Sequence, residues 1–156
     1  MKKIILLSLF ACMAVVSFSQ KNGGTYNWAA GLKYQPAALS LKHYNLKGDA
    51  IEFLLTKYNE GTRLTTLLEL CPKILNSGSL RAIVGPGFHV GVWDSDIVKN
   101  TYTKNPIIGF DAIVGIEYKI PRAPIAIQLD FQPSVDLVGN DQYFKDWGGI
   151  TIKFCW

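Results

Sequence analysis

Apolar and polar residues alternate along almost the whole chain after residue 20, in segments separated by clusters of Gly, Pro, Asn and Asp. A period of two places successive side chains on opposite faces of a β-strand, and no segment after residue 20 keeps a helical period with caps. The pattern therefore predicts an all-β protein. We expect eight strands, over Tyr26–Tyr34, Ala38–Tyr44, Ala50–Tyr58, Thr62–Cys71, Leu80–Trp93, Ile107–Ile120, Pro124–Val135 and Gly148–Trp156.

One face of every predicted strand is apolar and uncharged, and the other is polar, charged or small. The sixth strand gives the clearest apolar face, with Ile108, Phe110, Ala112, Val114, Ile116 and Tyr118. The fifth strand gives the clearest opposite face, with Arg81, Gly85, Gly87, His89 and Gly91. A soluble eight-stranded barrel would have to crowd the bulky residues into a narrow interior and place the glycines in solvent. We therefore expect an eight-stranded antiparallel up-and-down transmembrane β-barrel, with its apolar face toward lipid.

The first residues have the composition of a signal peptide. Lys2 and Lys3 precede an apolar run from Ile4 to Val16, and Ser17-Phe18-Ser19 supplies a small-x-small cleavage site. We expect a signal peptide over 1–19 and an outer-membrane barrel domain over 20–156. A retained helical anchor and a lipidated Cys12 are the less favoured alternatives.

Composition narrows the classes of function. Without residues 1–19 the chain carries 14 basic and 12 acidic residues, a balance that excludes a nucleic-acid-binding footprint. Cys71 and Cys155 are its two cysteines and lie on strands predicted to face each other across the barrel, so we expect free thiols. No Cys/His spacing predicts a metal site, and we expect no cofactor.

The predicted connections orient the barrel. Short turns at one end and the two longest loops, Asp94–Pro106 and Asp136–Trp147, at the other are typical of periplasmic and outer ends, which places both termini in the periplasm of a bacterial outer membrane. The periplasmic interface then carries an aromatic girdle of Trp28, Tyr118, Phe154 and Trp156. Pro86 interrupts the fifth strand, where we expect a β-bulge or a local bend.

Several short motifs resemble those of the small outer-membrane β-barrel family common in Bacteroidetes, in the eight-stranded class that includes OmpA-type and OmpX-type barrels. The motifs are Ser40-Leu41-Lys42-His43-Tyr44, Ala50-Ile51-Glu52, Gly85 to Gly91, Gly115-Ile116-Glu117-Tyr118-Lys119, Pro124-Ile125-Ala126 and Asp130-Phe131-Gln132-Pro133. The final Gly149-x-x-Ile152-x-Phe154, extended to Trp156, is similar to the C-terminal signal read by the barrel-assembly machinery. The resemblance implies a fold and an outer-membrane location, and no specific chemistry.

Charged residues on the polar face are the candidate site residues. They are Lys42, Glu52, Glu69, Arg81, His89, Asp111, Glu117 and Asp130. Distances from the turn centres predict that Lys42 lies opposite Glu52 and that Glu69 lies opposite Arg81. The favoured interpretation is a set of buried ion pairs that fill the interior, and the alternative is a polar path for protons or small solutes. His89 could also join Asp111 and Asp130 in acid–base chemistry.

These features favour a non-enzymatic monomeric barrel that contacts outer-membrane lipid and, through its outer loops, an unidentified partner. A lipid-modifying enzyme that hydrolyses or transfers acyl chains is the second hypothesis, although Ser40 and His43 lie on opposite faces of one strand and make no triad. A narrow channel for small solutes is the third.

Overall fold

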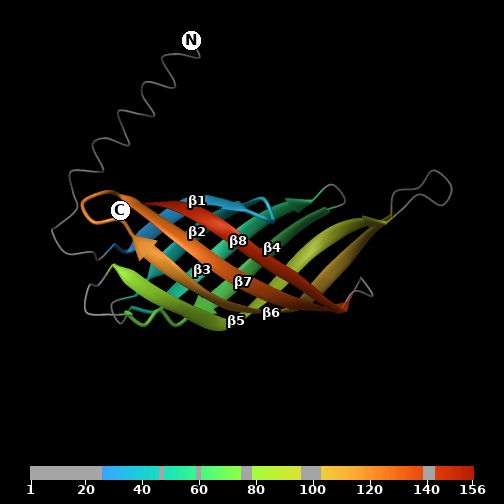
Figure 1. Cartoon of the computed structure of the whole chain (residues 1–156). Coiled ribbons are helices and arrows are strands. Elements are labelled where there is room, and N and C mark those ends of the chain that lie inside the picture. The colour runs from blue at the N-terminus through green and yellow to red at the C-terminus, as the bar shows by residue number, and fades with distance from the viewer. Residues whose placement is uncertain (1–25, 46–47, 59–60, 75–78, 96–102, 139–142) are drawn as a thin grey trace, which may run out of the picture.

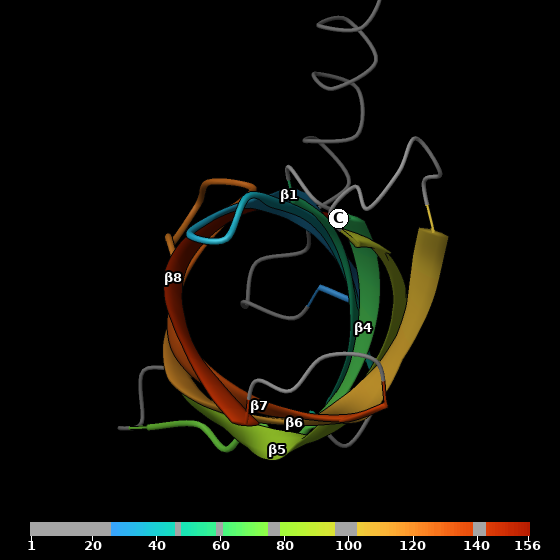
Figure 2. The same cartoon turned by 90° about the vertical axis from the view of Figure 1, so that its right-hand side faces the viewer.

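The computed structural model describes residues 26–45, 48–58, 61–74, 79–95, 103–138 and 143–156. Residues 1–19, where we expect the signal peptide, lie outside this range. The described chain forms one closed barrel of eight antiparallel strands in sequence order, as the alternation predicts, and β1 pairs with β8 to close it (Figures 1 and 2). The strands are β1 (Trp28–Tyr34), β2 (Ala38–Tyr44), β3 (Ala50–Tyr58), β4 (Gly61–Glu69), β5 (Leu80–Ser95), β6 (Thr103–Lys119), β7 (Ile125–Val138) and β8 (Tyr143–Cys155).

The two faces of the barrel wall have the polarity expected from the sequence. Large apolar side chains point outward and stay exposed along all eight strands, whereas the charged and amide side chains at inward positions are almost fully buried. On β3, for example, Ile51, Phe53 and Leu55 are exposed, and Glu52 between them is buried. The inward face is not wholly polar or small as expected, because large apolar side chains are buried among the charges; they include Leu54, Leu67, Ile83 and Ile113. The interior of this barrel therefore holds the buried charges, and its outer surface is apolar.

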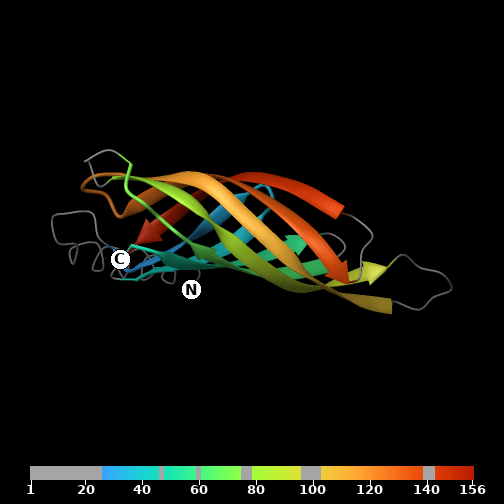
Figure 3. The ribbon, with the colours of Figure 1, turned by 90° about the horizontal axis from the view of Figure 1, so that it is seen from below.

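The strands have very different lengths, and this corrects the expected loops. β1 to β4 contain seven to nine residues, whereas β5 to β8 contain 13 to 17. Both segments expected as long loops are strand where the structure describes them, because the β5–β6 ladder continues to Ser95 and Thr103, β7 continues to Val138 and β8 begins at Tyr143. The longer hairpins extend past β1–β4 at the end opposite the chain termini (Figures 1 and 3).

The bulge expected at Pro86 is absent. β5 pairs with β6 without a register shift through the Pro86–Ala112 pair. On the β4 side, Leu70 and Val84 exchange both backbone hydrogen bonds, so Pro86, two residues further along, faces β4 where a donor would normally stand. The barrel wall therefore accommodates the proline by losing one backbone hydrogen bond between β4 and β5. The register shifts lie instead between β6 and β7 at Ile108/Gly109 and between β7 and β8 at Ser134/Val135.

Inward glycines allow neighbouring strands to approach closely. A Cβ atom at Gly85 would lie 1.8 Å from the carbonyl oxygen of Leu68, and one at Gly31 would lie 2.1 Å from that of Ile152. A side chain at either position would push two strands apart. Glycines on the inward face are thus needed for the close approach of neighbouring strands as well as for the space inside the barrel.

Candidate functional site

The barrel interior contains a balanced set of buried charges. Among the described residues, six cationic and six carboxylate side chains are buried, together with one histidine. The cations are Lys33, Lys42, Arg63, Arg81, Lys119 and Lys153; the carboxylates are Glu52, Glu69, Asp111, Glu117, Asp130 and Asp136; the histidine is His89. Since an unpaired buried charge is very unfavourable, this balance indicates a network that must form as a whole.

The half of the interior near the chain termini holds a lysine–glutamate cluster, formed by Lys42, Lys153, Glu52, Glu69 and Glu117. Lys42 Nζ lies 2.5 Å from Glu69 Oε2, 3.3 Å from Glu117 Oε2 and 3.8 Å from Glu52 Oε2. Lys153 Nζ lies 2.7 Å from Glu52 Oε1 and 3.8 Å from Glu117 Oε2. Each lysine therefore joins carboxylates from different strands and ties the wall together across the interior.

Two tyrosines close this cluster at the end near the termini. The hydroxyl groups of Tyr26 and Tyr44 both donate to Glu117 Oε1, and the guanidinium of Arg81 lies 4.7 Å from the centre of the Tyr44 ring. Burial, together with the charge of Glu117, raises the pKa of Tyr26 above its ordinary value. Tyr26 therefore stays protonated and serves as a hydrogen-bond donor.

The opposite half holds a histidine–arginine cluster, formed by His89, Arg63, Asp111 and Asp136. His89 Nδ1 lies 2.7 Å from Asp111 Oδ2, and His89 Nε2 lies 2.9 Å from Asp136 Oδ1. Arg63 forms an ion pair with the other oxygen of Asp111. His89 thus lies between two aspartates, with a carboxylate oxygen within hydrogen-bond distance of each ring nitrogen.

Amide side chains connect the two halves. Gln128 donates to Asp130 Oδ2 over 3.0 Å and accepts a hydrogen bond from Lys153 over 2.6 Å. Asp130 forms an ion pair with Lys33, and Gln132 donates to Asp111 Oδ1 over 3.1 Å. With Lys33 donating to Gln132 over 3.1 Å, hydrogen bonds run without interruption from one cluster to the other.

The structure brings together most of the residues that the sequence singles out, but with partly different partners. Lys42 lies opposite Glu52, as the turn distances predict. The predicted pairing of Glu69 with Arg81 is wrong, because the Leu70–Val84 and Lys73–Arg81 bridges move the turn centre from residue 75 to residue 77. Arg81 lies opposite Glu117 instead.

His89 also has a different set of partners from the one considered. It contacts Asp111 as considered, but its second carboxylate comes from Asp136, and Asp130 pairs with Lys33. The sequence analysis places Asp136 in a loop, whereas it lies within β7 and is buried.

The candidate list also omitted Lys33, Arg63 and Lys153. They share the inward parity of Lys42, and this signal was available in the sequence. Parity does not predict which of these cations contacts which carboxylate.

The aromatic residues expected at one interface lie at the end of the barrel that holds the termini. The backbone N–H of Trp28 donates to the carbonyl of Trp156, Tyr118 pairs with Ile127 near the start of β7, and the Phe154 and Trp156 rings are 6.2 Å apart. Within the C-terminal motif, Ile152 and Trp156 are exposed and Phe154 is half-buried.

Cys71 and Cys155 form no disulfide, as predicted, and both are buried. Burial is the main cause that raises the pKa of Cys71, to about 12. The Cys71 thiol is therefore not ionised at neutral pH and is poorly suited to act as a nucleophile.

The interior geometry limits the chemistry available. Both nitrogens of His89 are engaged by carboxylates, so neither is directed at a hydroxyl or thiol nucleophile. Ser40 donates to Glu52 over 2.5 Å, and His43 on the other face contacts the Asn27 carbonyl. Within the described ranges, no group of three His, Cys, Asp or Glu side chains is arranged to hold a metal ion.

Comparison with known proteins gives no relative: no family model, curated protein or solved structure matches this chain. A search of the described residues for a helix long and apolar enough to cross a membrane found none.

Proposed function

We propose that this chain is a non-enzymatic integral β-barrel of a bacterial outer membrane, with a sealed polar interior. The observation that carries the proposal is the inversion of the wall. Among the described residues, 29 large apolar side chains are exposed, spread over all eight strands, whereas six cationic and six carboxylate side chains are buried inside. Soluble monomers rarely expose apolar patches larger than a few hundred Å². A lipid environment accommodates this surface, and the closed ladder leaves no free strand edge along the part of the wall where all eight strands pair.

The charged interior favours a structural role over conduction. An ion pair between Lys42 on β2 and Glu117 on β6, and a hydrogen bond from Gln128 on β7 to Glu52 on β3, link opposite walls. An eight-stranded barrel is narrow enough to be filled by such side chains. The interior thus acts as a plug that fixes the barrel shape. An acyl-modifying activity lacks a base directed at a nucleophile, because the carboxylates occupy both His89 nitrogens.

A surface-contact role is supported by the long strands at the end opposite the termini. β8 begins at Tyr143, but its pairing with β1 begins only at the Tyr34–Ile150 pair, so among the described residues the first seven of β8 extend beyond the end of the β1 ladder. An unpaired strand edge presents backbone donors and acceptors to another extended segment. With both termini in the periplasm, this edge faces the cell exterior.

The proposed membrane location can be tested by a substitution that places a charge on the outward face of the barrel. Phe53 is 41% exposed and lies near the middle of β3. If that surface faces lipid, Phe53→Arg lowers the free energy of unfolding in vesicles by about 2–4 kcal/mol. Asn27→Arg, at an exposed position outside β1, is the matched control and stays within about 0.5 kcal/mol of the unmodified protein. Equal stability of the two variants would refute the membrane location, since a soluble surface tolerates either charge.

A further inference from the structure

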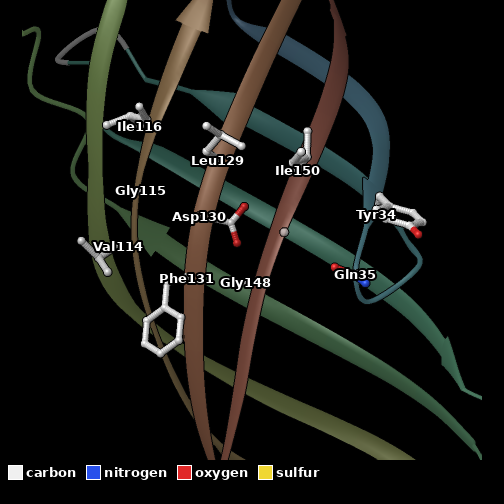
Figure 4. A pocket seen from close by; sticks show the side chains of 11 residues that line it. Tyr34, Gln35, Val114, Gly115, Ile116, Leu129, Asp130, Phe131, Gly148 and Ile150 are labelled. Carbon is white, nitrogen blue, oxygen red and sulfur yellow. The ribbon is translucent and has the colours of Figure 1, made fainter.

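The outward apolar face has a hollow of about 610 Å³ across β6, β7 and β8, called here the β8 hollow. Figure 4 shows its lining side chains, which come from adjacent strands of the barrel and from the end of β1. The apolar walls are Val114, Ile116, Leu129, Phe131 and Ile150. Asp130 also borders it, but its side chain is fully buried and paired with Lys33. The hollow is thus lined by apolar side chains, with polar groups restricted to one edge.

Gly148 creates this hollow, although the backbone does not require a glycine there. It takes an outward position of β8, opposite Phe131. A Cβ atom at Gly148 would lie 3.4 Å from the nearest atom, whereas one at neighbouring Gly149 would lie 2.5 Å from the Gln35 carbonyl oxygen. Gly148 has no positive φ. A larger residue would therefore fit the wall, and its absence leaves space in the belt that other strands fill with Ile, Leu or Phe.

A second apolar groove lies on the other side of Tyr34. It has a volume of about 1160 Å³ and is lined by outward residues that include Leu32, Leu39 and Leu55. Tyr34 and Ile150 border both grooves, and Tyr34 and Gln35 stand together at the β1 edge of the β8 hollow (Figure 4). Lys57 is the exposed charged side chain among the residues that line the two grooves. Two apolar grooves therefore share a wall that carries a hydroxyl group, and one of them also has a cation.

We propose that these two grooves bind one anionic phospholipid, with one acyl chain on each side of Tyr34. The proposal rests on the membrane location proposed above. The Tyr34 hydroxyl and the Gln35 amide would donate to the headgroup, and Lys57 would pair with its phosphate. Inside a bilayer, apolar contact gives no preference over other lipids, so selectivity comes from the shape of the hollow at Gly148 and from the headgroup contacts.

Native mass spectrometry after reconstitution tests this site. The protein is inserted into vesicles of equal parts phosphatidylglycerol and phosphatidylcholine, checked for co-flotation, extracted in mild detergent and weighed with its retained lipid. We expect one retained phosphatidylglycerol. Gly148→Leu fills the hollow and lowers retention about tenfold. Ala112→Leu adds the same side chain to an exposed position outside both grooves and leaves retention unchanged. Lys57→Gln keeps a lipid but lowers the preference for phosphatidylglycerol about two- to fivefold.

The results that would contradict the lipid site can be distinguished from one another. Equal retention by the unmodified protein and the Gly148→Leu variant, with co-flotation intact, overturns the lipid site and leaves the membrane location standing. Retention without preference for phosphatidylglycerol also overturns it. A dimer that is lost in the Gly148→Leu variant assigns the hollow to a second copy of the chain instead. Failure of the unmodified protein to float with vesicles refutes the membrane location and the lipid site together.

Discussion

Replacing Lys42 by Met removes the centre of the lysine–glutamate cluster and keeps the apolar stem of the side chain. In the folded barrel, Lys42 Nζ contacts Glu69, Glu117 and Glu52, and none of these side chains is more than 1% exposed. The variant removes the cation that all three buried carboxylates share, and Lys153 contacts only two of them, Glu52 and Glu117. Breaking a buried ion pair in this way costs about 3–5 kcal/mol. Since every 1.4 kcal/mol is about tenfold, the folding equilibrium constant falls by more than about a hundredfold.

Urea titration in vesicles, followed by tryptophan fluorescence, measures the loss. Lys73→Met changes an exposed lysine near the same end and is the matched control, with an expected change within about 0.5 kcal/mol. Adding Glu69→Gln to Lys42→Met removes the nearest carboxylate and recovers part of the loss, with a coupling of about 0.5–3 kcal/mol. A loss below about 1 kcal/mol for Lys42→Met alone would refute the network as the element that holds the interior together.

Four further predictions concern Cys71, Gly85 and Pro86. In a Cys155→Ser background, iodoacetamide modifies Cys71 at pH 8 more than about a hundredfold faster in the unfolded than in the folded protein, because its raised pKa removes the thiolate; comparable rates would contradict this burial. Because the pKa of Cys71 is higher in the folded than in the unfolded protein, the protonated thiol stabilises the fold fully below the unfolded pKa of about 8.5. This stabilisation is lost as the pH rises toward 12, and urea titration at pH 8 and 10 can detect the loss. Gly85→Ala forces two strands apart and destabilises by more than about 1 kcal/mol, whereas Gly148→Ala, which has room for a Cβ, stays within about 0.5 kcal/mol; similar losses would show that the close approach at Gly85 is unimportant. Pro86→Ala restores a donor toward β4 and stabilises by about 0.5–1.5 kcal/mol, and a loss of stability would show that the proline is required there.

The strand order and the two faces of the barrel wall could be predicted because an alternation with a period of two depends only on whether a residue's position in the strand is odd or even. Ile51, Phe53 and Leu55 had to share one face whatever the register of β3 with its neighbours. Strand ends were harder to predict. β7 continues past Pro133, which pairs with Asp146, as far as Val138, and Asp136 keeps the inward parity of Asp130 and Gln132. A loop after Val135 was the natural interpretation of the sequence.

Ion-pair partners could be predicted only where a short turn sets the register. The Lys42–Glu52 pairing follows from the β2–β3 turn. The Glu69–Arg81 pairing failed because the longer connection after β4 shifts the centre by two residues. Pairs that cross the interior, such as Lys42 with Glu69 from β4, depend on how the barrel closes and on side-chain reach, and neither is encoded in parity.

Heat-modifiable migration of the membrane fraction tests the central claim most directly. A closed membrane barrel stays folded in cold detergent, so the account predicts that the chain is found with the outer-membrane fraction and that its electrophoretic mobility differs between unheated and boiled samples. Recovery of the protein in the soluble fraction without detergent, with the same mobility before and after boiling, would contradict the account.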